Sequence, residues 1–194
     1  MPRSICLIQG HPHGAEKHFC HALADSYEHG ARLGGMQVSH IDLGSMDLSL
    51  LRDPADFLAA PPPPVADAQD KIRNADHLVV VFPLWLGTMP AVVKAFFEHV
   101  CRNNFAVEQD AEGGLPKQKL KGKSARVIVT MGMPAFAYRT GFGAHGVRSL
   151  EKSILGMAGV GPVRETLIGG VGALNKSSAA ALLLKIQELG RRAR

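Results

Sequence analysis

The sequence lacks the features that define membrane and disulfide-stabilised proteins. Its longest apolar stretch, residues 78–90, is too short to cross a bilayer. Three cysteines, Cys6, Cys20 and Cys101, form no CxxC pair and leave one unmatched, so we expect no disulfide framework. The first residues run into an apolar segment without a signal-peptide core or cleavage site. We therefore expect a reduced, cytoplasmic protein with no membrane insertion.

The sequence also lacks a strong excess of one charge. It has 22 lysines and arginines against 17 aspartates and glutamates, a formal net charge of +5. The basic residues are thinly spread, with the densest groups at 117–123 and near the C-terminal end. A solvated loop and a helix end account for these groups, and we expect no nucleic-acid partner.

Three ligand-binding motifs are absent in the context that gives them meaning. No GxGxxG segment directly follows a predicted strand, since the match at 141–146 starts well after Thr130, and no GxxxxGK segment occurs; this excludes the dinucleotide-binding fingerprint and the P-loop. A phospho-acceptor receiver needs an acidic pair where the first strand ends, but here that strand runs Ile8-Gln9-Gly10-His11. Any nucleotide-like ligand would have to be held in another way.

Short apolar runs alternate with segments of helical periodicity, which is typical of a parallel sheet built from βαβ units. The predicted strands are Ser4–Gln9, Gln37–Asp42, 77–82, Ser124–Thr130 and 163–167. The predicted helices run from Phe19 to the Gly34–Gly35 pair, over 66–75, onward from Pro90, over 149–158 and over 176–189. Three segments are predicted to be loops: residues 44–64, residues 117–122 and a glycine-rich stretch ending at Gly146. The pattern predicts one α/β domain over 1–194: a doubly wound five-stranded parallel sheet in three layers.

Three segments follow the carboxyl ends of predicted strands, where such sheets bind ligands. They are residues 10–19, 83–89 and 131–146. Each is rich in groups that a packed core would exclude. We therefore expect the functional site to lie where these segments meet.

The first segment carries four histidines, His11, His13, His18 and His21, near the start of a predicted helix. His18 and His21 share a helix face, so a metal site is conceivable. No carboxylate or thiolate stands at a convincing spacing, and we expect no metal there. Backbone N–H groups of the loop and the helix N-terminus favour contact with a phosphate instead.

The other two segments contain groups suited to a planar ligand. Trp85, the only tryptophan, lies between two prolines and could flank such a ligand or cap the core. Gly132 would let backbone N–H groups approach a ligand closely. Tyr138 and His145 could donate hydrogen bonds to charge that develops during hydride transfer, although either could be structural.

The most specific motif is Phe-Pro-Leu-Trp-Leu-Gly-Thr-Met-Pro-Ala at 82–91, followed by Lys94, Phe96, Phe97 and Glu98. With the 130–138 stretch and His145–Gly146, it resembles the NAD(P)H:quinone oxidoreductase family with the flavodoxin-like fold. This group contains DT-diaphorase, the modulator of drug activity B and the ancillary subunits of potassium efflux systems. The resemblance spans essentially the whole chain.

The resemblance implies a non-covalent flavin, FAD or FMN, and assigns residues to its parts. The isoalloxazine ring would be lined by Pro83, Leu84, Trp85, Leu86 and Gly87. Its pyrimidine edge would be approached by Thr130, Met131, Gly132 and Met133. The ribityl and phosphate groups would be held by His11, His18, Phe19 and Cys20, where the family usually has Ser-Phe-Asn in place of the last three. The catalytic pair that stabilises the reduced flavin would be Tyr138 and His145.

The implied activity is ping-pong transfer of hydride from NAD(P)H through the flavin to a quinone or similar planar acceptor. The resemblance also implies a homodimer, with apolar surface supplied by Phe96 and Phe97 on the helix after Pro90. The alternative is a flavin-binding regulatory subunit of a transporter such as a potassium efflux system. A single-electron carrier fits less well, because flavodoxins of that kind are strongly acidic.

Overall fold

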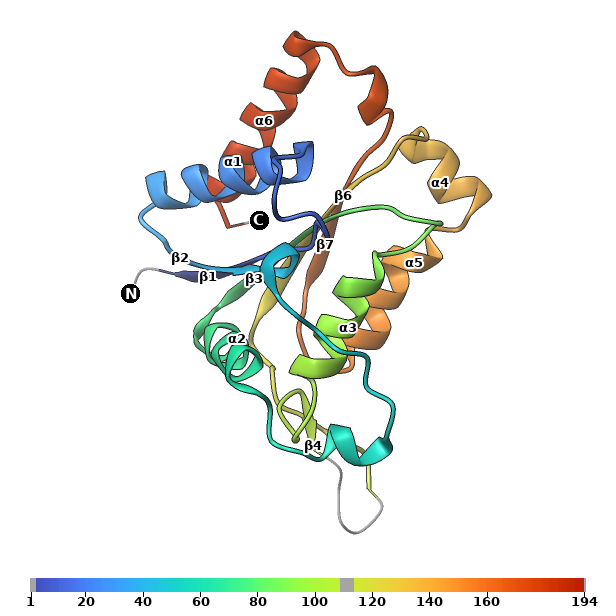
Figure 1. Cartoon of the computed structure of the whole chain (residues 1–194). Helices are drawn as coiled ribbons and strands as arrows, with labels where there is room; N and C mark the ends of the chain where they lie inside the picture. Colours follow the sequence, from blue (N-terminus) through green and yellow to red (C-terminus); the bar gives the residue numbers. More distant parts are fainter. Residues whose placement is uncertain (1–2, 109–113, 194) are drawn as a thin grey trace.

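A computed structural model describes residues 3–108 and 114–193. Its centre is a five-stranded parallel sheet with the strand order β2-β1-β3-β6-β7 (Figure 1). The strands are β1 Ser4–Gln9, β2 Gln37–Asp42, β3 His77–Pro83, β6 Ser124–Thr130 and β7 Val163–Ile168. All five predicted strands are confirmed, two of them one residue longer than expected. The three central strands β1, β3 and β6 are almost entirely buried because helices cover both of their faces, whereas the edge strands β2 and β7 are more polar and partly exposed.

Helices cover both faces of the sheet, which confirms the three-layer arrangement. Helices α1 (Phe19–Leu33) and α6 (Lys176–Arg191) lie on one face, and α2 (Pro63–Asn74) and α3 (Ala91–Val100) on the other (Figure 1). The sheet's side chains alternate between two cores: Val79 and Val81 pack under α1 and α6, whereas Val80 and Phe82 pack under α2 and α3.

The structure corrects three predicted loops. Residues 44–64 include the short 3-10 turn Pro54–Phe57, and α2 already begins at Pro63 because proline is tolerated in a first helical turn. Residues Lys117–Gln118 form β5, which pairs antiparallel with β4 (Val107–Glu108). The glycine-rich stretch after β6 contains two helices, α4 (Ala135–Gly141) and α5 (His145–Arg148), which lead into the π-helix Ser149–Gly156.

Helices α1 and α6 approach each other closely through two glycines. A Cβ atom on Gly30 would lie 2.7 Å from the carbonyl carbon of Gln187, and one on Gly190 would lie 2.9 Å from that of Tyr27. The two backbones are thus in direct contact at this crossing.

In the described residues, no helix is long and apolar enough to cross a membrane.

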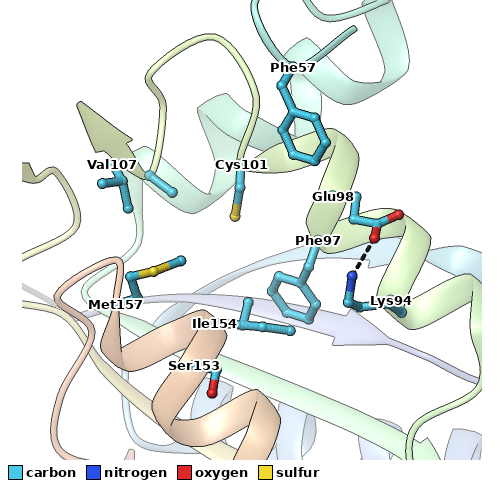
Figure 2. A pocket seen from close by; sticks show the side chains of 10 residues that line it. Phe57, Lys94, Phe97, Glu98, Cys101, Val107, Ser153, Ile154 and Met157 are labelled. Atoms are coloured by element: carbon cyan, nitrogen blue, oxygen red, sulfur yellow. Dashed lines mark hydrogen bonds and ion pairs between the residues drawn. The ribbon is translucent and has the colours of Figure 1, made fainter. Parts of the chain in front are cut away.

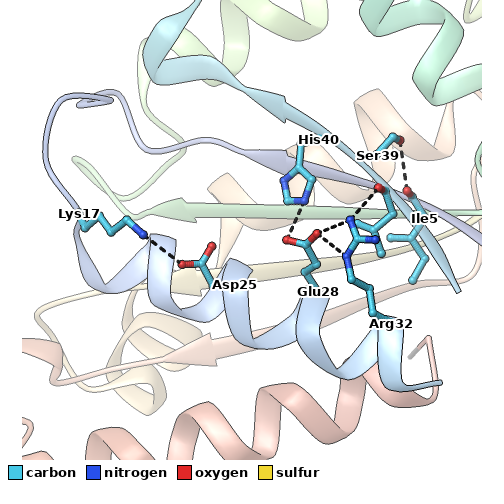
Figure 3. A network of polar contacts seen from close by, with 8 residues as sticks. Ile5, Lys17, Asp25, Glu28, Arg32, Ser39 and His40 are labelled. Atoms are coloured by element: carbon cyan, nitrogen blue, oxygen red, sulfur yellow. Dashed lines mark hydrogen bonds and ion pairs between the residues drawn. The ribbon is translucent and has the colours of Figure 1, made fainter. Parts of the chain in front are cut away.

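A polar network joins α1 to the edge strand β2 (Figure 3). Glu28 on α1 accepts a hydrogen bond from Nε of Arg32 at 2.8 Å, and its other carboxylate oxygen lies 2.8 Å from Nε2 of His40. Ser39 of β2 also donates to the carbonyl of Ile5 on β1 at 3.2 Å. These contacts help hold the edge strand in register.

His77 gives the fold a defined pH dependence. It is buried at the start of β3, with Nδ1 2.8 Å from the hydroxyl of Ser124 and with no hydrogen-bond partner among the described atoms for Nε2. Burial, together with the nearby positive charges of Arg3, Arg126 and Arg164, lowers the pKa of His77 to about 4. The imidazole is therefore neutral in the folded chain at pH 7.

We expect the stability that depends on neutral His77 to be present above the unfolded-state pKa of about 6.5 and lost as the pH falls toward 4. Between pH 7.5 and pH 5 the loss should be about 2 kcal/mol. Urea unfolding of the parent and of His77→Gln at both pH values checks this, because glutamine can still bond to Ser124 but does not titrate. Equal pH dependence in the two proteins would contradict it.

Candidate functional site

The three segments predicted to form a site meet at the carboxyl edge of the sheet. The amide of Gly10 donates to the carbonyl of Val81 at 2.7 Å, and the amide of Leu84 donates to that of Thr130 at 2.7 Å. The strand order reverses between β1 and β3, where sheets of this kind form a ligand crevice. The predicted convergence of these segments is confirmed.

The 85–88 segment is a tight turn with apolar side chains facing solvent. Trp85 and Thr88 exchange backbone hydrogen bonds of 2.9 and 3.0 Å. The side chain of Trp85 is 51% exposed and that of Leu86 is fully exposed, so Trp85 does not cap the core. Leu86 has φ 48° and Gly87 φ 80°, and a left-handed conformation at a leucine costs free energy. Exposed apolar groups on a strained turn indicate a ligand-binding surface.

Tyr138 lies beneath this turn. Its side chain is fully buried, and its hydroxyl donates to the carbonyl of Gly87 at 3.0 Å. The same hydroxyl oxygen accepts a hydrogen bond from the amide of Val147 at 3.3 Å. Burial raises the pKa of Tyr138, so the phenol keeps its proton at neutral pH. The hydroxyl has one proton to donate, and it donates that proton in the hydrogen bond to the carbonyl of Gly87. This corrects the expectation that Tyr138 lies on a loop facing the ligand: it supports the turn from helix α4.

Gly146 and His145 complete this side of the site. A Cβ atom on Gly146 would lie 2.6 Å from Cα of Thr88, so only glycine allows α5 to pack against the turn. The side chain of His145 is exposed, and its ring folds over Gly143. His145 is therefore open to a ligand, whereas Tyr138 is not in this structure.

The segment after β6 offers backbone rather than side chains. The side chains of Thr130 and Met131 are buried, and the amide of Met131 donates to the carbonyl of Ile168 at 2.9 Å. Met133 is half-buried, and its carbonyl accepts from the amide of Gly170 at 3.1 Å. A Cβ atom on Gly132 would meet nothing within 4 Å. The exposed backbone at Gly132 is thus the part of this segment that a flat ligand could approach.

Two close contacts fix the loop between β1 and α1. A Cβ atom on Gly10 would lie 2.8 Å from Val93, and one on Gly14 would lie 2.8 Å from the carbonyl carbon of Gly44. The first turn of α1 contains no acidic residue, so no carboxylate within that turn offsets the positive end of the helix dipole. This arrangement suits an anion such as a phosphate.

Of the two predicted residues at the start of α1, the side chain of Cys20 contributes less than expected, and the role of Phe19 stays a prediction. Cys20 is buried, and its sulfur lies 3.1 Å from the hydroxyl of Thr130. Burial raises the pKa of Cys20 to about 11, so the thiol is neutral and only its backbone can serve a ligand. Phe19 is half-buried at the start of α1.

The four histidines form a cluster of rings on this loop. The rings of His11 and His18 stack with centroids 4.0 Å apart, and Nδ1 of His13 lies 3.0 Å from Nε2 of His18. Burial lowers the pKa of His11, and the neighbouring His18, His21 and His13 lower it further. His11 therefore offers a neutral imidazole at pH 7 and no charge to an anion.

A pocket elsewhere on the molecule is apolar. It lies between α3 and the π-helix Ser149–Gly156, with Phe97, Cys101 and Met157 around it and the Lys94–Glu98 ion pair at its rim (Figure 2). None of its lining residues belongs to the three strand-end segments. It is thus separate from the candidate site.

The residues at the carboxyl edge fit a flavin. The exposed Trp85–Leu86 surface suits a planar apolar ring, the open backbone at Gly132 suits its polar edge, and the loop before α1 suits a phosphate. Two contacts that position these parts, Gly14 on Gly44 and Gly146 on Thr88, were not predicted from sequence. Both join residues remote in sequence, and no local signal identifies them.

Comparisons with known proteins agree with this reading of the fold. An NAD(P)H oxidoreductase of Haemophilus influenzae, itself uncharacterised, is 26% identical over 69% of this chain and 66% of its own length. An FMN-dependent NADH:quinone oxidoreductase of the same species is 28% identical over 62% of this chain and 59% of its own length. The matches thus cover less than two thirds of each relative.

A solved structure extends the likeness over the full chain. The NAD(P)H:quinone oxidoreductase of Methanothermobacter marburgensis superposes with a TM-score of 0.82 at 21% identity, covering 100% of both chains. A family model described as the flavodoxin-like fold matches residues 3–191. The resemblance predicted from sequence is confirmed, and the chain belongs to this flavodoxin-like family.

Proposed function

We propose that this protein is an NAD(P)H oxidoreductase that uses a non-covalent flavin, FMN or FAD, to reduce a quinone or similar planar acceptor. The observation that carries the proposal is the exposed Trp85–Leu86 turn, held in a strained conformation beside the open backbone of Gly132 at the switch point of the sheet. The names of the two Haemophilus influenzae relatives support the same reaction class. A bound flavin would accept hydride from NAD(P)H and pass the electrons to the acceptor.

The chain's own residues would bind and orient the reactants. Trp85 and Leu86 pack on a planar ring and exclude water from one side of it. The backbone at Gly132 approaches the polar edge of that ring, and the loop ending at His18 receives the phosphate. His145, exposed beside the turn, is placed to donate a hydrogen bond to charge that develops at the ring edge.

Steady-state kinetics test this function. The purified protein, supplied with FMN or FAD, should oxidise NADH or NADPH in the presence of a soluble quinone. Donor and acceptor occupy one site in turn, so double-reciprocal plots should be parallel. No oxidation above that of free flavin would contradict the proposal, and mass analysis of the released cofactor would distinguish FMN from FAD.

A regulatory role in a transporter complex is the competing hypothesis. An ancillary subunit would bind flavin but turn over slowly unless its partner were present. The same assay with and without a candidate potassium efflux transporter separates the two.

The three free cysteines, two of them buried, suit the reducing cytoplasm, where we place the protein.

The residues first expected to supply the homodimer surface are largely buried. Phe96 lies in the chain's own core, and Phe97 is 4% exposed and only lines the pocket beside α3, so neither supplies a broad partner surface. The apolar pocket beside α3 is open instead, and Met157 at its edge is 59% exposed (Figure 2). We infer that a second copy of the chain covers this face.

We expect light scattering at micromolar concentration to give twice the chain mass. Met157→Glu should shift the protein to the monomer, because the charge would have to be buried in the interface. Leu184→Glu, an equally exposed position on α6 on the other side of the sheet, should leave the dimer intact. A monomeric parent, or equal effects of the two variants, would contradict this interface.

A further inference from the structure

We propose that His13, Glu16 and His18 form a binding site for a divalent transition metal of the zinc class. One ligand atom from each of the three lies within 4.8 Å of the others. No carboxylate stands at a suitable spacing in the sequence, but the loop folds Glu16 back toward the imidazoles. The imidazole pair is also His13 with His18, not His18 with His21.

The distance between the two imidazoles suits one metal ion. Nδ1 of His13 lies 3.0 Å from Nε2 of His18. Zinc–nitrogen bonds of about 2.0–2.1 Å at a tetrahedral angle separate neighbouring ligand atoms by about 3.4 Å. A small rotation of the exposed His13 ring reaches that value. The ion would replace the proton that the two rings otherwise share.

Other imidazoles hold the two histidine ligands in place. The amide of His13 donates to Nδ1 of His11 at 3.2 Å, and the amide of His18 donates to Nδ1 of His21 at 3.0 Å. The ring of His11 stacks on that of His18 at 4.0 Å, which restrains its plane. These contacts restrain the backbone of both ligand residues and the ring plane of His18.

The ligand types select the ion. Two imidazole nitrogens and one carboxylate oxygen suit Zn²⁺, Ni²⁺ or Cu²⁺, whereas Mg²⁺ and Ca²⁺ prefer oxygen ligands alone. Three protein ligands leave a fourth tetrahedral position for water or an anion. Because Glu16 and His13 are exposed, the ion can enter from solvent without opening the fold.

Calorimetric titration of the flavin-free, EDTA-treated chain with Zn²⁺ tests the site. We expect one Zn²⁺ per chain, at least tenfold weaker binding in His13→Asn and weaker binding in Glu16→Gln. His29→Asn, at an exposed histidine further along α1, is the matched control and should change affinity less than twofold. Co²⁺ in place of Zn²⁺ should give visible absorption bands that His13→Asn removes.

Three results would overturn the proposal: no stoichiometric binding, unchanged affinity in His13→Asn, or Mg²⁺ binding as tightly as Zn²⁺. The site does not depend on the proposed flavin function. Flavin titration of His13→Asn in the presence of EDTA distinguishes the metal site from the flavin site. If the variant loses zinc binding but retains the parent's affinity for flavin, the metal site is separate.

Discussion

Gly30→Ala should destabilise the protein by at least about 3 kcal/mol, although alanine is the better helix former by about 1 kcal/mol. The new Cβ atom would lie 2.7 Å from the carbonyl carbon of Gln187, and backbone cannot yield as a flexible side chain would. Helices α1 and α6 would have to separate, which opens the core above β1 and β3. In a chain of this size the melting temperature should fall by about 6–12 °C.

The same substitution at Gly141, near the end of α4, is the control. A Cβ atom there would meet nothing within 4 Å, so Gly141→Ala should stay within about 1 kcal/mol of the parent. Urea unfolding of both variants measures the difference. If Gly30→Ala were as stable as Gly141→Ala, that result would contradict the close backbone contact between α1 and α6.

Tyr138→Phe should slow reduction of the bound flavin by NAD(P)H by about 10-fold to 1,000-fold while flavin content stays near normal. The hydroxyl supports Gly87 in the free protein. We expect it to turn toward the ring when negative charge develops there, because a donor that binds the transition state more tightly than the ground state raises the rate. Stopped-flow absorbance at the flavin bands measures the rate directly.

Tyr27→Phe is the matched control, since Tyr27 is the only other tyrosine and is buried between α1 and the sheet. Its flavin should be reduced at the parental rate. If the flavin bound to Tyr138→Phe were also reduced at the parental rate, Tyr138 would have a structural role alone. It would then act only through its hydrogen bond to the carbonyl of Gly87, and its loss would appear as lower thermal stability.

The sheet could be predicted from sequence because its central strands are largely apolar runs buried on both faces, and the alternation with helical segments then identified the more polar edge strands β2 and β7. The convergence of three segments at its carboxyl edge followed from parallel topology alone. Helix α4 was missed because Gly141, Gly143 and Gly146 hide the helical periodicity, although Pro134 directly before it is a typical start signal. Tyr138 was therefore expected on a loop, when the helix buries it.

Contacts between residues remote in sequence could not be predicted. The approach of Gly30 to Gln187 and of Gly146 to Thr88 depends on how whole elements pack. The exposure of Trp85 also required the structure, because its flanking prolines suit a buried and an exposed side chain equally. The metal-ligand geometry at His13 and Glu16 depends on an irregular loop path that no periodicity describes.

We propose that a flavin lies on the Trp85–Leu86 turn against the backbone of Gly132. Because Trp85 is the only tryptophan, its fluorescence reports this site alone. Titration with FMN and with FAD should quench it to saturation at one flavin per chain. Gly132→Ala, whose methyl group meets no protein atom within 4 Å, should keep the stability of the flavin-free chain but bind flavin at least tenfold more weakly. No saturable quenching by either flavin would contradict the account.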